Sequence, residues 1–138
     1  MADFVVDASA TLVWCFRDEP VDWIETLFRS LISGREAIVP RHWAFEVANS
    51  FVIAMRRGRA TRLELERAFH ALRALPIYTD MTGDATVFTA MVNLAEKHRL
   101  SVYDAAYMEL AMRSRLPLAT LDDDLRAAAA SAGIAVLK

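Results

Sequence analysis

The sequence contains one cysteine, Cys15, among its 138 residues, so no internal disulfide can form. No cluster of cysteine and histidine has the spacing of a zinc site. A single thiol is typical of a reducing compartment, and we expect a cytoplasmic protein. The N-terminus lacks a basic region followed by a long apolar stretch, which argues against a signal peptide. No uncharged apolar run reaches the roughly 18–20 residues that a membrane-spanning helix requires.

Neither sign of charge is in excess, because 16 Lys and Arg stand against 18 Asp and Glu. This balance excludes an argument for nucleic-acid binding from overall charge, so any such contact must come from a local basic cluster. Hydrophobic residues make up 55% of the chain and charged residues 25%, a globular composition. The length suits one domain, residues 1–138, whose core needs no disulfide or structural metal.

Short apolar runs alternate with longer segments of helical period, the pattern of strand–helix units around a mostly parallel sheet. The predicted strands cover 4–6, 37–39, 77–78, 118–119 and 134–137. The predicted helices cover 9–16, 22–33, 42–55, 61–75, 85–98, 103–114 and 123–131. The sequence therefore predicts one α/β domain with four or five short strands.

Asp7 follows directly on the first predicted strand. In an open α/β sheet, ligands bind outside the carboxyl ends of the strands, so a carboxylate here lies in the usual ligand site. An Asx turn that leads into the next helix accounts for the residue equally well. Position alone leaves both roles open for Asp7.

Glu46 is the one charged side chain in the predicted helix from His42 to Met55. A carboxylate in so apolar a helix is costly unless it is paired, protonated or bound to metal. A solvated glutamate on an amphipathic helix usually has Lys, Arg or Gln as neighbours, and these are missing here. The pattern favours a functional role for Glu46.

Asp104 and Asp122 have simpler interpretations as helix caps. Residues 101–104 match the S-x-x-[DE] capping box, and Thr120 with Asp123 matches T-x-x-D. Acids also favour a helix N-terminus, and Asp124 is expected to be solvated. Considered together, however, Asp7, Asp104 and Asp122 all lie close to strand ends that a parallel topology brings to one edge.

Three or four carboxylates at one sheet edge repel one another unless protons or cations compensate them. Ligation by oxygen alone selects a hard cation, Mg²⁺ or Mn²⁺. The combination of the three aspartates with Glu46 therefore predicts a metal-dependent phosphoryl-transfer site.

Four short motifs, in their order and spacing, also give the chain a family resemblance. They are Val5-Val6-Asp7-Ala8-Ser9, Pro40 with Phe45-Glu46-Val47-Ala48-Asn49, Tyr103-Asp104-Ala105-Ala106-Tyr107, and Ala119-Thr120-Leu121-Asp122. Over essentially its whole length the chain resembles the PIN domain and, within that family, the VapC toxins of bacterial toxin–antitoxin pairs. The resemblance implies a three-layer α/β/α sandwich around a short, mostly parallel sheet.

The resemblance also implies roles for individual residues. Asp7 and Asp104 match the principal metal-binding acids, Glu46 the second acid, and Asp122 the fourth, a role that Asp123 or Asp124 could share. The polar residues that support these acids in the family are matched by Ser9, Asn49 and Thr120. The implied activity is a Mg²⁺- or Mn²⁺-dependent endoribonuclease that is usually a homodimer and binds a cognate antitoxin in an apolar groove beside the active site.

Two further groups of residues are candidates for contacts with these partners. The basic residues near the turn at Gly58 are possible RNA phosphate contacts, or arginines favoured by a helix C-terminus: Arg56, Arg57, Arg59 and Arg62. The aromatic residues close to the acids are candidates for the groove wall, although most at such spacing belong to a core: Trp14, Phe16 and Trp43. No histidine is required, and His42, His70 and His98 are expected at the surface or at helix ends.

Other protein classes fit the sequence less well. A phospho-accepting receiver domain needs a lysine near its last strands, and neither Lys97 nor Lys138 is so placed. A phosphatase with an aspartyl nucleophile prefers Asp-x-Asp after the first strand, where this chain has Asp7 followed by alanine and serine. Two alternatives remain: a PIN nuclease of RNA or DNA processing that is not a toxin, and a non-catalytic protein- or DNA-binding module that keeps the acids for structure.

Overall fold

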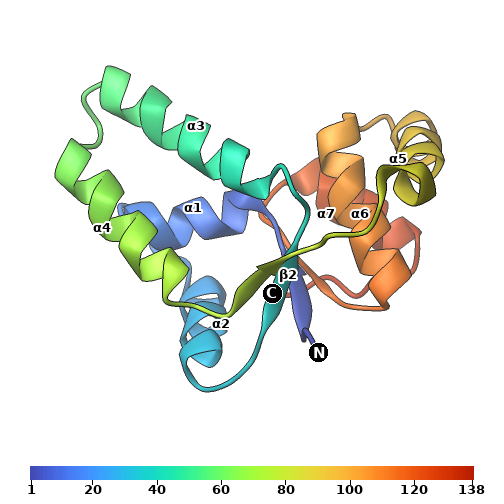
Figure 1. Cartoon of the computed structure of the whole chain (residues 1–138), viewed down its shortest axis with the longest axis horizontal. Coiled ribbons are helices and arrows are strands. Elements are labelled where there is room, and N and C mark those ends of the chain that lie inside the picture. Colours follow the sequence, from blue (N-terminus) through green and yellow to red (C-terminus); the bar gives the residue numbers. More distant parts are fainter.

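The computed structural model describes all 138 residues and contains four strands and seven helices (Figure 1). The strands are β1 (Phe4–Val6), β2 (Ala37–Val39), β3 (Ile77–Thr79) and β4 (Leu118–Ala119). The helices are α1 (Ala8–Phe16), α2 (Asp22–Ile32), α3 (Trp43–Arg56), α4 (Arg62–Arg73), α5 (Asp84–His98), α6 (Val102–Ser114) and α7 (Asp123–Ser131). Every predicted helix is present, with ends within two residues of those expected.

The fifth predicted strand, at 134–137, is reduced to one bridge. Val136 pairs with Leu118 in parallel, and two backbone hydrogen bonds of 2.9 Å attach the segment to Leu118. Because β4 is only two residues long, its outer edge offers too few partners for a full strand.

The four strands form one parallel sheet in the order β3-β2-β1-β4. Val5 in β1 lies opposite Ile38 on one side and Leu118 on the other. The chain moves outward from β1 to β2 and β3 and then returns to β1's other side with β4. The direction of winding therefore changes between β1 and β4, the place where open α/β sheets bind ligands.

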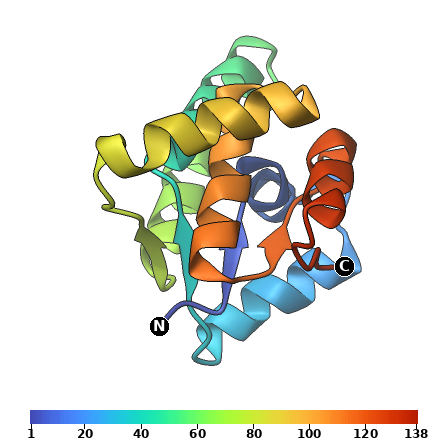
Figure 2. The same cartoon turned by 90° about the vertical axis from the view of Figure 1, so that its right-hand side faces the viewer.

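Helices cover both faces of the sheet, which confirms the expected three-layer sandwich (Figures 1 and 2). Phe4 and Val6 of β1 pack with residues of α1, α2 and α3, whereas Val5 packs with α6 and α7. This is the alternation that a strand imposes on successive side chains. Figure 2 shows α6 lying across the sheet and α5 lying over α6.

Helices α3 and α4 extend side by side away from the sheet as an arm (Figure 1). Gly58 takes a φ of +68° in the turn between them, a conformation that favours glycine. A capping box then starts α4, with Thr61 accepting from the amide of Glu64 and the Glu64 carboxylate accepting from the amide of Thr61, both at 3.2 Å. None of the seven helices combines the length and apolarity that crossing a bilayer demands.

Phe28 is the position at which we expect the core of α1 and α2 to be most sensitive. Its ring is fully buried and stacks on Trp14, with centroids 4.7 Å apart. Replacement of Phe28 by alanine is expected to lower the free energy of unfolding by about 3–5 kcal/mol in urea titrations. Replacement of exposed Ile32, at the end of the same helix α2, by alanine should cost less than about 0.5 kcal/mol. Similar losses for the two variants would contradict this packing.

Candidate active site

Asp7 is a buried carboxylate at the carboxyl end of β1, with only 4% of its surface exposed. It caps α1, and its Oδ1 accepts hydrogen bonds from the Ala10 amide at 3.0 Å and the Ser9 hydroxyl at 2.7 Å. Its Oδ2 accepts a short hydrogen bond from the Thr120 hydroxyl. Three of roughly four acceptor positions are thus filled, which leaves one on Oδ2 for a ligand.

Thr120 and Ser9 connect the carboxyl ends of β4 and β1. The Thr120 hydroxyl accepts from the Asp122 amide at 3.0 Å, and the Ser9 hydroxyl accepts from the Leu121 amide at 2.9 Å. The two hydroxyl oxygens lie 3.4 Å apart. Thr120 therefore holds Asp7 instead of capping α7 with Asp123, and the expected T-x-x-D capping box is wrong. The cap of α7 is Asp122, whose carboxylate accepts from the Leu125 amide at 2.8 Å.

Glu46 lies in the first turn of α3, where it is half-buried beside α6. The Tyr107 hydroxyl donates to Glu46 Oε1 over 2.6 Å, and His42 Nε2 lies 3.3 Å from the same oxygen. Burial and the negative charge of Glu46 raise the pKa of Tyr107, so its hydroxyl keeps its proton and serves as a donor. The isolated carboxylate that the sequence pointed to thus has an aromatic partner from another helix.

Asp104 and Asp122 complete the acidic group. Asp104 lies in the first turn of α6, where its amide donates to the capping Ser101 hydroxyl at 3.1 Å, as the S-x-x-[DE] pattern predicts. Burial, followed by the negative charges of Asp122 and Glu46, raises the pKa of Asp104. The pKa of Asp7 is also raised, chiefly by burial, with a smaller contribution from Glu46 and against the effect of its hydrogen bonds.

The structure therefore brings the four predicted acids into one electrostatic cluster at the carboxyl edge of β1 and β4. The negative charge of Glu46 contributes to the raised pKa of both Asp7 and Asp104, and the charge of Asp122 contributes to that of Asp104. No group of three or more His, Cys, Asp and Glu side chains is placed to ligate one ion together. The cluster is a set of neighbouring oxygen ligands and not a closed metal cage.

The chemistry of this ligand set suits a hard divalent cation. All four groups are carboxylates, and the recorded ion pairs of arginine involve other acids. The raised pKa values of Asp7 and Asp104 reflect burial and mutual repulsion, both of which a bound cation would relieve. A cation bound beside Asp7 and Asp104 would therefore be stabilised by both carboxylates.

Sequence reasoning missed the groups that hold the acids in place. Tyr107 lies one turn after Asp104 in α6, and His42 lies four residues before Glu46, so helical spacing carried a signal for both. The Trp43 indole donates to the Thr11 hydroxyl at 3.1 Å, and that hydroxyl donates to the Asp7 carbonyl at 2.8 Å. This pair links the start of α3 to the start of α1, and no local pattern identifies it.

Several candidates lie apart from the cluster. Asn49 is exposed on α3 and takes no part in the hydrogen-bonded network around Asp7, while Asp123 and Asp124 are exposed in the first turn of α7. The four arginines are exposed near the far end of α3, where Arg59 lies 3.9 Å from Asp18 and Arg62 lies 3.1 Å from Glu66. Arg56 is ten residues from Glu46, which is about 15 Å along the helix.

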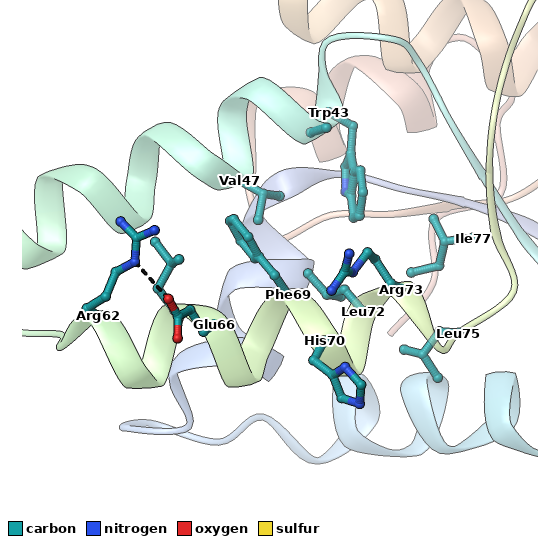
Figure 3. Close-up of a pocket in the computed structure, with 12 residues that line it drawn as sticks. Trp43, Val47, Arg62, Glu66, Phe69, His70, Leu72, Arg73, Leu75 and Ile77 are labelled. Atoms are coloured by element: carbon teal, nitrogen blue, oxygen red, sulfur yellow. Dashed lines mark hydrogen bonds and ion pairs between the residues drawn. The ribbon is translucent and has the colours of Figure 1, made fainter.

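A groove of about 800 Å³ lies between α3 and α4 and reaches the start of β3 at Ile77 (Figure 3). Trp43 and Val47 from α3 and Phe69 from α4 point into it, and charged residues of α4 flank it. Of the aromatics predicted to form its wall, only Trp43 does so. Trp14 and Phe16 pack inward instead, with centroids 4.7 Å from Phe28 and 4.6 Å from Phe51, respectively.

Comparison with known families identifies the class of this α/β sandwich and its acidic edge. The family model described as "PIN domain" matches residues 4–131. The chain therefore belongs to the PIN-domain family, as its motifs indicated.

Individual relatives agree with this membership. The chain is 34% identical over 127 residues to Ribonuclease VapC3 of Pyrobaculum aerophilum, covering 88% of this chain and 90% of that protein. The solved structure of PAE2754 from Pyrobaculum aerophilum shares the fold with a TM-score of 0.69 at 22% identity, over 92% of this chain and 79% of that one. The solved structure of FitAcB from Neisseria gonorrhoeae also shares the fold, with a TM-score of 0.65 at 16% identity, over 98% of this chain and 96% of that one.

Replacement of Asp104 by asparagine is expected to stabilise the metal-free protein at pH 7. Because the pKa of Asp104 is raised in the folded state, folded protein binds a proton more tightly than unfolded protein does. Stability contributed by the neutral form is therefore lost as pH rises above the ordinary value of 3.8. In urea titrations with EDTA, the free energy of unfolding of Asp104→Asn should exceed that of wild type at pH 7, and the difference should vanish near pH 4.

The exposed acid Glu19 offers a matched control for this measurement. Glu19→Gln should follow the wild-type pH profile throughout. An Asp104→Asn protein that is less stable than wild type at pH 7 in EDTA would show that this carboxylate serves the fold and not a charged site.

Proposed function

We propose that the chain is a metal-dependent endoribonuclease, with one nuclease domain over residues 1–138, and the toxin of a cytoplasmic VapBC-type toxin–antitoxin pair. The observation that carries the proposal is the convergence of four carboxylates, none of them paired with an arginine or lysine, at the carboxyl edge of β1 and β4. Similarity to a protein named Ribonuclease VapC3 over 88% of the chain supports ribonucleic acid as the substrate. The single free thiol, half-buried Cys15, suits a reducing compartment.

In this proposal Asp7 and Asp104 would hold the principal Mg²⁺ or Mn²⁺ ion, and Glu46 and Asp122 would bind it directly or through water. Such an ion neutralises phosphodiester charge and lowers the pKa of a bound water. Ser9 and Thr120 orient the Asp7 carboxylate, and Tyr107 orients Glu46, so that ligand oxygens face the substrate in fixed positions. Asn49, which is exposed on the helix of Glu46, remains a candidate supporting residue for the complex with RNA.

The reaction is hydrolysis of an RNA phosphodiester. The oxygen of water forms a bond to phosphorus as the bond to the 3′ oxygen breaks, and that oxygen takes a proton. The products are a 5′-phosphate and a 3′-hydroxyl. Phosphate contacts that keep the RNA chain in register with the site come from the basic cluster Arg56, Arg57, Arg59 and Arg62. The first of these, Arg56, lies about 15 Å along α3 from Glu46.

Metal-dependent cleavage of RNA by purified protein tests the proposal. A pool of tRNA, rRNA and mRNA should give discrete products with Mg²⁺ or Mn²⁺ and none with EDTA. Asp7→Asn and Asp104→Asn should each lower the cleavage rate by at least about 100-fold, because each removes a principal charged ligand. Mn²⁺ should raise the melting temperature of wild type and not that of the two variants.

Glu19→Gln serves as the control for cleavage, because this acid is exposed and remote in sequence from the cluster. It should cleave at the wild-type rate. Folded wild type that neither cleaves RNA nor gains stability from Mn²⁺ would eliminate the nuclease and favour a non-catalytic binding module. Cleavage by a chain whose gene has no antitoxin neighbour would favour a PIN nuclease of RNA processing.

The partner proposed for the groove between α3 and α4 is an apolar segment of the cognate antitoxin. The groove begins at Trp43, which is three residues from Glu46, so a bound segment would also lie beside the acids. Its apolar floor and the charged side chains of Arg62, Glu66 and Arg73 suit an amphipathic peptide (Figure 3). We also propose a homodimer, for which exposed Phe88 and Val92 on α5 provide apolar surface.

Filling the groove should weaken antitoxin binding. Ala44 lines the groove and is exposed, so Ala44→Trp adds bulk without disturbing the core. Affinity for the antitoxin encoded beside this chain should fall at least about tenfold in calorimetry, while RNA cleavage by the variant escapes inhibition. Ala127→Trp, at an exposed site on α7, should bind as wild type does. Equal affinity of both variants would place the antitoxin elsewhere.

A further inference from the structure

Two large aromatic side chains remain mostly exposed beside the acidic cluster. Tyr103 has 65% of its surface exposed and directly precedes Asp104, and Phe45 has 78% exposed and directly precedes Glu46. Each lies in the first turn of its helix together with the acid that follows it. Two aromatic rings that the fold does not bury therefore lie in the same helical turns as Glu46 and Asp104.

Tyr103 is fixed relative to the acids by a chain of ring contacts. Its ring packs against His42 with centroids 5.6 Å apart, and His42 meets Tyr107 edge-on at 5.0 Å. The Tyr107 hydroxyl then donates to Glu46 at 2.6 Å. The Tyr103 ring is thus held in place on one side, while much of its surface stays open to solvent beside Asp104.

Few cationic groups are free to contact a phosphate at this border, because Arg126 donates to the backbone carbonyls of Thr120 and Leu137. None of the four acids forms an ion pair with an arginine or lysine, so the immediate surroundings are negative. The arginine cluster begins at Arg56, about 15 Å along α3 from Glu46. The arginine cluster therefore contacts the RNA away from the cleaved bond, and the nucleotide next to that bond needs a contact that does not depend on charge.

We propose that Tyr103 stacks on an unpaired base adjacent to the cleaved phosphodiester, with Phe45 providing a second ring on the side of Glu46. This inference rests on the proposed ribonuclease function. Aromatic side chains stack on bases of any sequence, whereas bases within a duplex already have both faces covered. The favoured substrate is consequently a single-stranded segment or loop, positioned by stacking close to the acids and by arginine–phosphate contacts farther away.

Fluorescence of 2-aminopurine placed at successive positions of a short single-stranded RNA tests this proposal. Asp7→Asn protein in Mg²⁺ allows binding to be followed without cleavage. In this background Tyr103→Ala and Tyr103→Leu should lose the quenching at one position and weaken binding about fivefold or more, and Tyr103→Phe should restore both. An RNA that is abasic at that position should bind all variants equally. Tyr78→Ala, which alters a half-exposed tyrosine on edge strand β3, provides the control and should change nothing.

Several results would overturn the stacking role. Tyr103→Leu with wild-type affinity, or equal losses for intact and abasic RNA, would show that the ring does not contact a base. A change in molecular mass on light scattering for Tyr103→Ala would assign the surface to contact between copies of the chain. Cleavage assays without the Asp7→Asn change distinguish the two proposals. A Tyr103→Ala protein that cleaves RNA with an unchanged KM would contradict stacking and leave the nuclease proposal standing. Wild-type protein that neither binds nor cleaves any RNA would contradict both.

Discussion

The structure depends on keeping the Asp7 carboxylate buried at the junction of β1 and β4. A carboxylate with 4% exposure is tolerated only if its oxygens find donors, and here the Ala10 amide and the hydroxyls of Ser9 and Thr120 supply them. Those donors come from the first turn of α1 and the end of β4. The same contacts that satisfy one buried acid therefore fix where two strands end and where the first helix begins.

The four acids share a second constraint, because each of them lies at a helix N-terminus. Asp7 and Asp122 cap α1 and α7, while Glu46 and Asp104 lie in the first turns of α3 and α6. Free amide groups and the helix dipole stabilise negative charge there by about 0.3–1 kcal/mol each. This contribution partly offsets the repulsion among the acids, which lets the protein hold them together without an ion pair to arginine or lysine.

Local patterns were sufficient to predict the elements and the positions of the acids, and they failed where tertiary contacts decide. Residues 134–137 have the composition of a strand, but β4 is too short to pair with all of them. Thr120 matches a capping box, yet its hydroxyl is committed to Asp7, more than a hundred residues earlier. The partnership of Tyr107 with Glu46 joins helices that are distant in sequence, so only the folded chain reveals it. Trp14 and Trp43 look alike in sequence, and packing alone decides that one is stacked on Phe28 and the other lines the groove.

In the proposed nuclease, helix α3 serves two opposite requirements of a site that acts on a polyanion. A site rich in carboxylates repels RNA, so binding energy has to come from groups outside it. The helix places Glu46 in its first turn and Arg56, the first residue of the arginine cluster, in its last, which separates the two charges by about 15 Å along the helix. At that separation the arginines lie farther away than a Debye length at physiological salt, and they neither neutralise the acids nor compete with a metal for them. In the proposed binding mode, the exposed rings of Tyr103 and Phe45 stack on bases between these two regions, which adds affinity for RNA without adding charge. The acids can then keep the uncompensated charge that a divalent cation requires.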